Sequence, residues 1–224
     1  MKICCVSDLH GYTPEIPDCD LLILGGDYQT QKYGWMQWRD VYVPWINDIA
    51  ERGIKVIGVA GNHDWMFIRE RDNLIRANWT YLQDSGCEFN GLNIWGSPWQ
   101  PRFFDWAFNL DESELELKWN LIPDNTDVLV LHGPPHGFGD LSPYSRSGGQ
   151  YERTGSPSLT KRIKQISPKL VVCGHIHSGY GMYMCDDTMI VNAAQVNEQY
   201  QLTNKPVLVE IRPIGYIYED ERGF

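Results

Sequence analysis

The sequence predicts an α/β fold in which residues 1–224 form a single domain with two stacked β-sheets and flanking helices. Three observations predict it. The 224 residues are 42% hydrophobic and 21% charged, which suits one globular domain with a sizeable core. Up to residue 173, short apolar runs rich in Val, Ile and Leu alternate with segments of helical periodicity. From residue 180 onward, strand-like runs follow one another with turns between them, as in a β-meander.

Five of the apolar runs indicate strands that are buried on both faces, because they lack the polar alternation of half-exposed strands. They are Ile3–Val6, Leu21–Leu24, Lys55–Val59, Val128–Leu131 and Leu170–Cys173. The strands of the later meander are expected to pack as the second sheet. They are Met182–Met184, Thr188–Val191, Val207–Ile211 and Tyr216–Tyr218.

Helices are expected between the strands of the first part. Aromatic and aliphatic side chains recur at helical spacing from Trp35 to Ile49, and Gly53 fits the C-terminus of that helix. Ser156 followed by Pro157 indicates another helix start, because serine caps the first turn and proline fits within it. The expected helices are Trp35–Arg52, Trp65–Asn78, Asp111–Asn120 and Ser156–Ser167.

Two longer stretches, Ser97–Leu110 and His136–Gly155, are expected to be irregular loops near the functional site. The first is rich in aromatic residues and fits the core or a hairpin tip as well as a wall for the substrate. The second is rich in Gly and Ser and fits a plain surface loop as well as a mobile lid.

Charge and composition exclude several function classes. A formal net charge of −10 at pH 7 opposes any extended binding to nucleic acid. The sequence has no run of 18 apolar residues, and charged Asp8 comes too early for a signal peptide, so we expect neither a membrane span nor secretion. The six cysteines form no C-x-x-C pair and several lie in apolar runs. We therefore expect buried, reduced thiols in a cytoplasmic protein.

A polar or glycine-rich turn follows each of the five buried strands, and these turns carry the reactive residue types. Because ligands bind beyond the carboxyl ends of the strands in open α/β sheets, we expect the five turns to meet in one place. Their carboxylates, imidazoles and amide match the ligand set of a two-metal hydrolase. The expected ligands are Asp8, His10, Asp27, Asn62, His132, His175 and His177, with Asp27 bridging the two ions.

These turns resemble the calcineurin-like metallophosphoesterases, whose pattern is D-x-H, G-D, G-N-H-D/E, H and G-H-x-H. Every block occurs in this order between Asp8 and His177. The resemblance implies the four-layer α/β/β/α sandwich of that family, the metallo-dependent phosphatase fold, with two mixed sheets flanked by helices. Within that family, four segments look most similar to the small metallophosphoesterase-domain (class III phosphodiesterase-like) proteins: Trp95–Trp99, His132–Gly137, Gly155–Leu159 and Gly174–Gly181. Some members of that subgroup have glycine at one ligand histidine, whereas His175 and His177 are both present here.

The resemblance also implies a role for each residue. Two sets are similar to the ligands of the two ions: Asp8, His10, Asp27 and His177 for the first, and Asp27, Asn62, His132 and His175 for the second. His63 is similar to a catalytic residue that faces the leaving group or a phosphate oxygen, with Asp64 holding its ring. An imidazole so oriented can donate a proton near neutral pH while a metal-bound hydroxide attacks phosphorus in line.

Three residues have a second interpretation. Asp64 fits the cap of the helix that begins near Trp65 as well as a catalytic role. His136 is a candidate for substrate binding or an exposed loop residue, and Trp99 is a candidate for substrate binding or a core residue.

The expected function is metal-dependent hydrolysis of small phosphodiesters, with cyclic nucleotides among the candidate substrates. The expected cofactors are two divalent or trivalent metal ions, of which manganese is favoured, while iron, zinc or nickel also suits nitrogen and oxygen ligands. Two alternatives remain open. One is a phosphomonoesterase that acts on nucleotides or phosphoproteins, and the other is a catalytically weak scaffold that keeps the fold and binds partners.

Overall fold

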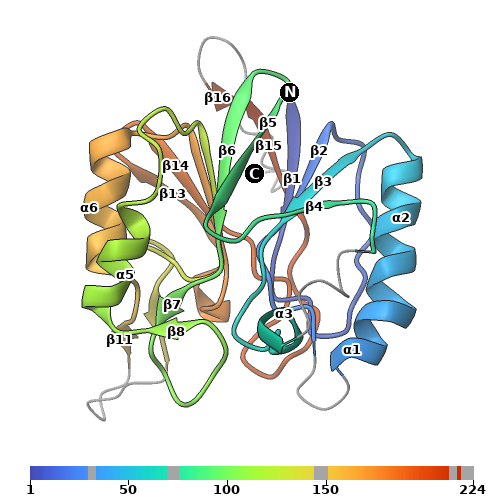
Figure 1. The fold of residues 1–224 in the computed structure, drawn as a ribbon, viewed down its shortest axis with the longest axis horizontal. Helices are drawn as coiled ribbons and strands as arrows, with labels where there is room; N and C mark the ends of the chain where they lie inside the picture. The colour runs from blue at the N-terminus through green and yellow to red at the C-terminus, as the bar shows by residue number, and fades with distance from the viewer. Residues whose placement is uncertain (30–33, 70–75, 144–150, 212–215, 218–224) are drawn as a thin grey trace, which may run out of the picture.

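The computed structural model describes residues 1–29, 34–69, 76–143, 151–211 and 216–217, and Figure 1 shows the predicted four layers. The first sheet has the strand order β16 (Tyr216–Ile217), β15 (Val207–Ile211), β1 (Lys2–Val6), β2 (Leu21–Leu24), β3 (Lys55–Gly58) and β4 (Thr80–Tyr81). The second has the order β13 (Gly181–Cys185), β14 (Thr188–Asn192), β12 (Leu170–Cys173), β9 (Val128–Leu131), β6 (Leu92–Ser97) and β5 (Ser85–Phe89). The expected mixed α/β/β/α architecture is confirmed.

Helices cover the outer face of each sheet (Figure 1). The first sheet carries α1 (Gly34–Gln37) and α2 (Val43–Glu51), and the second carries α5 (Glu112–Trp119) and α6 (Pro157–Ile166). One apolar cluster fills the space between the two sheets. A second lies between the first sheet and its helices, and a third lies between the second sheet and its helices. Strands β2, β9 and β12 are buried along their whole length, which explains their continuous apolar sequences.

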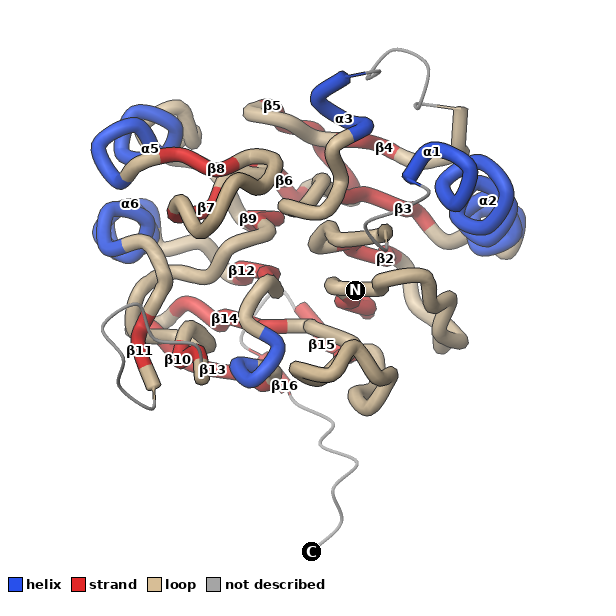
Figure 2. Tube along the Cα trace, turned by 90° about the horizontal axis from the view of Figure 1, so that it is seen from below, coloured by secondary structure: helices blue, strands red, loops and turns tan. Residues whose placement is uncertain are grey.

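The arrangement of the strands brings the polar turns together. Strands β1, β2 and β3 run parallel to one another, as do β6, β9, β12 and β14. The two sheets are joined beyond their strand ends, where Ser7 forms a parallel bridge with Ala194 and its N–H donates to Ala193 O at 2.9 Å. Figure 2 looks onto this end, where loops from both sheets lie side by side.

The prediction of which strands form the second sheet is wrong. Strand β15 pairs antiparallel with β1, with Lys2 opposite Glu210 and Cys5 opposite Val207, and β16 pairs with β15. These two strands therefore extend the first sheet and cover the edge of β1. Only β13 and β14 of the predicted meander join the second sheet, beside β12.

Three of the four predicted helices are confirmed, the first with an interruption. Between α1 and α2, residues Trp38–Tyr42 form a π-helical turn in which the Val43 N–H donates to Trp38 O, five residues back. Pro44 follows and has no N–H for the regular ladder. Helices α5 and α6 begin after the caps Asp111 and Ser156.

The predicted helix Trp65–Asn78 is too long. The structure has α3 over Met66–Arg69, residues 70–75 lie outside the described residues, and residues 76–79 form a turn and bends. There the N–H of Asn78 donates to Asn47 Oδ1 at 2.7 Å, so a contact with α2 replaces the helical bond. Trp79 then packs against Tyr28 and Trp38 just before β4.

The β5–β6 hairpin was not predicted, although its turn carries a signal. Asn90 and Gly91 join the strands with φ of 49° and 76°, the left-handed conformation that an Asn-Gly hairpin turn adopts. The two expected loop stretches also contain short strand pairs: β7 (Gln100–Pro101) with β8 (Asn109–Leu110), and β10 (Leu141–Ser142) with β11 (Glu152–Arg153).

The six cysteines are free thiols, as expected. Four of them are buried, whereas Cys19 and Cys87 are half-buried.

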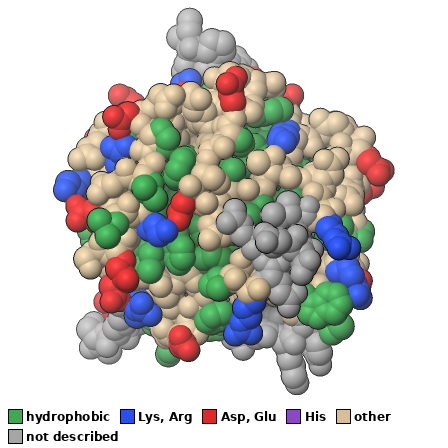
Figure 3. All heavy atoms as spheres, in the orientation of Figure 1, with side chains coloured by type: hydrophobic (Ala, Val, Ile, Leu, Met, Phe, Trp, Pro, Cys, Tyr) green, Lys and Arg blue, Asp and Glu red, His purple; other side chains and the backbone are tan. Residues whose placement is uncertain are grey.

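On the face that Figure 3 shows, acidic and basic side chains are interspersed rather than gathered by sign. Among the described residues, no helix is both long and apolar enough to cross a membrane.

Candidate metal centre

Four of the seven expected ligands have a left-handed backbone. The φ angles are 54° at Asp8, 40° at His10, 56° at Asp27 and 67° at His175. This conformation costs about 1–2 kcal/mol for a residue with a Cβ, so the surrounding structure must hold it. The N–H of Asp8 donates to Gly26 O at 2.9 Å and that of His10 to Asp27 O at 3.0 Å, which ties the turns after β1 and β2 together.

Asp27 lies at the centre of the site. Its Oδ1 accepts the His63 N–H at 2.7 Å. Its Oδ2 faces three imidazoles, with the Nε2 atoms of His132, His10 and His63 at 3.4, 3.8 and 3.9 Å. Gly61 makes this approach possible, because a Cβ at that position would collide with the Asp27 carboxylate and the His132 ring.

The first group of expected ligands lies on the β1 side of Asp27. The ligand atoms of Asp8, His10 and His177 lie within 4.8 Å of one another, and His177 Nε2 is 3.3 Å from Asp8 Oδ1. The Nδ1 atoms of His10 and His177 are 3.1 and 3.0 Å from the carbonyl oxygens of Gln29 and Asn197. These contacts direct both Nε2 atoms into the site.

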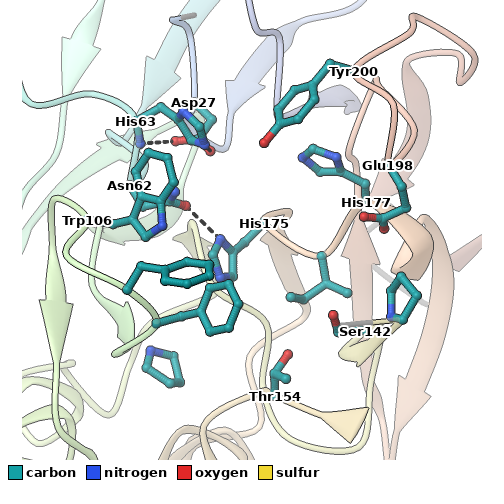
Figure 4. Close-up of a pocket in the computed structure, with 15 residues that line it drawn as sticks. Asp27, Asn62, His63, Trp106, Ser142, Thr154, His175, His177, Glu198 and Tyr200 are labelled. Atoms are coloured by element: carbon teal, nitrogen blue, oxygen red, sulfur yellow. Dashed lines mark hydrogen bonds and ion pairs between the residues drawn. The ribbon is translucent and has the colours of Figure 1, made fainter. Parts of the chain in front are cut away.

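The second group converges on the side chain of Asn62. Its Oδ1 is 2.8 Å from His132 Nε2 and 2.7 Å from His175 Nδ1 (Figure 4 draws the second contact). The other nitrogen of His132 is 2.8 Å from Gly25 O, so the backbone orients this ring too. The structure thus brings all seven expected ligands together around Asp27, and the ligand atoms of Asp8, Asp27 and His132 also lie within 4.8 Å of one another.

Burial and neighbouring groups favour an ionised Asp8 and neutral rings at His10 and His175. Burial lowers the pKa of His10 to about 4, and burial together with the charge of His132 lowers that of His175 to about 3. Burial opposes charge on Asp8, yet the hydrogen bond and charge of His177 bring the pKa of Asp8 to about 2. Burial also opposes charge on His132, but Asp27 raises the pKa of its ring to about 9. A cation at His132 would have to displace this proton.

These residues fit divalent metal ions. The Nε2 of His10 is buried with no hydrogen-bond partner among the described residues, although it points at a carboxylate 3.8 Å away. A buried nitrogen without a partner is unfavourable in a chain without an ion and favourable as a ligand. Carboxylate oxygens and imidazole nitrogens together suit transition metals such as manganese, iron, zinc or nickel, and the donor set does not select one of them.

His63 lies in the cleft beside Asp27, but Asp64 does not bond to its ring. His63 points into the site, and its Nδ1 is buried without a hydrogen-bond partner among the described residues. Asp64 instead accepts the backbone N–H groups of Gly61, Asp27 and Tyr28 at 2.7, 2.8 and 3.0 Å. The expectation that Asp64 holds the His63 ring is therefore wrong. Both carboxylate oxygens of Asp64 hold the backbone around Asp27 in place, and neither caps the helix that follows.

A cleft of about 810 Å³ opens over the site. Phe103, Phe104 and Trp106 form one wall and come from the loop that joins the parallel strands β7 and β8. Trp106 lies over the His63 ring with centroids 4.3 Å apart (Figure 4). Ser142, Thr154, Glu198 and Tyr200 line the opposite side. Both expected loop stretches thus contribute residues to the lining of the cleft. The two short strands within Ser97–Leu110 are parallel, so the hairpin expected as one alternative for this stretch is not formed.

Glu198 and Tyr200 were not predicted. The Tyr200 ring lies edge-on to His10 with centroids 4.8 Å apart, and its hydroxyl points into the cleft in Figure 4. The backbone φ of Tyr200 is 58°, which is unusual for an aromatic residue. Both residues follow β14 and belong to no recognisable motif. Contacts with distant residues bring their loop to the site, among them the bridge of Ala194 to Ser7 and the contact of Asn197 O with the His177 ring.

The two candidates for substrate binding lie outside the cleft and match their second interpretations. Trp99 donates its indole N–H to Asp84, with Nε1–Oδ2 at 2.9 Å, and it does not line the cleft. Lys118 Nζ lies 4.6 Å from the same ring and also contacts Asp84, so Trp99 belongs to a structural cluster. His136 does not line the cleft either. Its side chain is 45% exposed and lies 3.6 Å from Asp140, as an exposed loop residue would.

We expect Trp99→Phe to destabilise the protein without altering its chemistry. The substitution leaves Asp84 with one donor fewer and should lower the free energy of unfolding by about 1–3 kcal/mol. Denaturant titration measures this loss. The matched control is Trp95→Phe, because the buried Trp95 N–H has no partner among the described residues. A raised KM with unchanged stability in Trp99→Phe would instead place Trp99 in substrate binding.

Comparisons with known proteins agree with this geometry. Residues 1–179 match the sequence profile of a family described as "Calcineurin-like phosphoesterase". The chain is 34% identical over 239 residues to human "Metallophosphoesterase domain-containing protein 1", covering 94% of this chain and 71% of that protein. A UPF0046 protein of Caenorhabditis elegans is 42% identical over 137 residues, 60% of this chain and 33% of its own length. One solved structure superposes with a TM-score of 0.58 at 16% identity, covering 85% of this chain and 89% of its own, which supports the fold.

Proposed function

Because the chain belongs to the calcineurin-like phosphoesterase family, we propose that it hydrolyses phosphodiesters at a two-metal centre. One observation carries this proposal. Asp27 Oδ2 faces His132 at 3.4 Å and His10 at 3.8 Å, and these imidazoles belong to different ligand groups. A carboxylate between two groups of ligands is what a two-metal site requires as its bridge.

In this proposal the two groups hold one ion each and share Asp27. Asp8, His10 and His177 complete the first, and Asn62, His132 and His175 complete the second. When bound, such ions neutralise charge on the phosphoryl oxygens and lower the pKa of water. Manganese is the first metal to assay.

His63 is the proposed proton donor to the leaving group. Its ring lines the cleft beside Asp27, and Trp106 covers it. Histidine suits proton transfer near neutral pH, and a positioned acid contributes about 10²–10⁴-fold to the rate. Asp64 acts indirectly in this proposal. Its carboxylate accepts the backbone N–H groups of Gly61 and Asp27 and so sets the position of the bridging Asp27 side chain.

The aromatic wall supports a substrate with a planar group next to the phosphate. Phe103 and Phe104 pack with centroids 4.2 Å apart, and Phe104 is 73% exposed at the cleft. Exposed rings beside a polar site are suited to bind a flat apolar group. Cyclic nucleotides and aryl diesters carry such a group, which makes them the first substrates to test.

Trp106→Ala should lower kcat/KM for an aryl diester by about tenfold, because the His63 ring loses the indole packed against it and the substrate loses part of its wall. Metal content should not change, and Trp106→Phe should retain most of the activity. The control is Trp35→Ala, at an exposed tryptophan of α1. Equal activity in Trp106→Ala and wild type would remove Trp106 from the site.

A substrate panel tests the proposed function. We expect the manganese-loaded protein to hydrolyse bis(p-nitrophenyl) phosphate and a cyclic nucleotide faster than p-nitrophenyl phosphate. Preference for the monoester would favour the phosphomonoesterase alternative. Hydrolysis of none of the three, by protein that holds two ions, would favour the scaffold.

A further inference from the structure

The wall of the cleft opposite Trp106 carries a carboxylate that the metal centre does not use. Among the described residues that line the cleft, Glu198 is the only acidic residue besides Asp27, and none is Lys or Arg. In Figure 4 the Glu198 carboxylate lies beside His177, on the same side as Ser142. A negative charge here is unexpected in a cleft that accepts phosphate.

The fold holds Glu198 in this place. Its Oε1 accepts the backbone N–H of Ser178, the neighbour of His177, at 2.8 Å. The preceding residue, Asn197, contacts the His177 ring through its carbonyl at 3.0 Å. The Asn197 side chain also accepts the N–H groups of Gln199 and Gln201 at 2.9 and 3.0 Å, which stabilises the turn. Glu198 is therefore a half-buried, fixed charge rather than a freely moving surface side chain.

We propose that Glu198 is a specificity-determining residue that makes the site prefer singly charged phosphodiesters to doubly charged phosphomonoesters. The inference rests on the proposed function and deepens it. A phosphomonoester carries a charge of about −1.5 to −2 at pH 7, whereas a diester carries one negative charge. A fixed carboxylate repels both, and it repels the monoester more strongly because the energy grows with the product of the charges.

The chemistry of the wall agrees with this role. The neighbours of Glu198 in the cleft, Ser142, Thr154 and Tyr200, offer neutral hydroxyl groups. Hydroxyl groups can bind an esterified phosphate oxygen or a sugar hydroxyl, but they do not balance an additional charge. Selection by charge thus complements the aromatic wall, which selects by shape.

Two inert ligands test the inference without turnover. Phenylphosphonate is a dianion at about pH 8.5, and methyl(phenyl)phosphinate is a monoanion of similar shape. Calorimetry on the manganese-loaded protein measures the Kd of each. Glu198→Gln keeps an oxygen acceptor for the Ser178 N–H and removes the charge. We expect it to shift the ratio of the two Kd values by about tenfold in favour of phenylphosphonate.

The matched control is Glu116→Gln on α5, which changes the net charge equally but lies outside the cleft. It should leave the ratio within about twofold, because exposed charges at a distance are screened. Glu198→Ser is a second variant without the charge and should shift the ratio in the same direction. A ratio that Glu198→Gln and Glu198→Ser leave unchanged, or that Glu116→Gln shifts equally, overturns the inference.

A kinetic measurement separates this inference from the proposed function. p-Nitrophenyl phosphate and p-nitrophenyl methylphosphonate share a leaving group but differ in charge. Glu198→Gln should raise kcat/KM for the first relative to the second by about tenfold. An active diesterase in which this ratio does not move contradicts the role of Glu198 alone. A wild-type protein that hydrolyses no ester contradicts the proposed function, while the calorimetry still decides the role of Glu198.

Discussion

His63→Ala should lower kcat for a phosphodiester by about 10²–10⁴-fold while the protein keeps its metal ions. The His63 ring lines the cleft and faces Asp27 at 3.9 Å, but it belongs to neither proposed set of ligands. Its removal therefore takes away the proton donor and leaves the ligand atoms in place. Steady-state kinetics, together with elemental analysis of the same preparation, measures both quantities.

The chemistry of the leaving group sharpens this prediction. A diester with a p-nitrophenyl leaving group needs little protonation, so its loss of kcat should be smaller than that of an alkyl diester. His136→Ala is the matched control, since His136 is an exposed histidine outside the cleft. An equal loss for both diesters, or a loss of metal in His63→Ala, would contradict the role of proton donor.

Asp27→Asn should abolish two-metal binding and lower kcat/KM by about 10³-fold or more, because it removes the one carboxylate shared by both groups of ligands. The amide keeps the shape of the side chain and an oxygen for the His63 N–H. The effect should thus come from the lost charge rather than from a collapsed loop. Elemental analysis should find fewer than two ions per chain.

Thermal unfolding gives a second measurement for Asp27→Asn. An ion at a hundred times its Kd stabilises the native state by about 2.7 kcal/mol, which raises Tm by roughly 5–10 °C for a chain of this size. Manganese should raise the Tm of the wild type by this amount and that of Asp27→Asn by much less. Asp124→Asn, at an exposed aspartate, controls for net charge. An equal rise in both proteins would show that Asp27 does not bind the metal.

Much of the fold and the centre follows from local sequence. Apolar runs such as Leu21–Leu24 need no knowledge of their neighbours to be recognised as buried strands, and the turn after each strand carries its own ligands. The strands with which a given strand pairs, however, can lie far from it in the sequence. β15 could pair with either sheet, and only its register with β1 places it in the first.

The errors at the site have the same origin. The aromatic surroundings of Trp99 indicate a substrate wall, but its partner Asp84 lies 15 residues earlier. The neighbour His63 suggests a catalytic role for Asp64, but Asp64 accepts an N–H from Asp27, 37 residues away. Glu198 carries no motif, and its position depends on a hydrogen bond to the residue after His177. Side-chain roles set by distant contacts therefore require the folded structure.

In the proposed function, the seven ligands hold two ions that support hydrolysis of a phosphodiester. The most direct measurement is hydrolysis of bis(p-nitrophenyl) phosphate by protein in which elemental analysis finds two ions per chain. We predict turnover that a chelator removes and manganese restores. A rate no higher than that of the chelated sample, in protein that holds both ions, would contradict the claim.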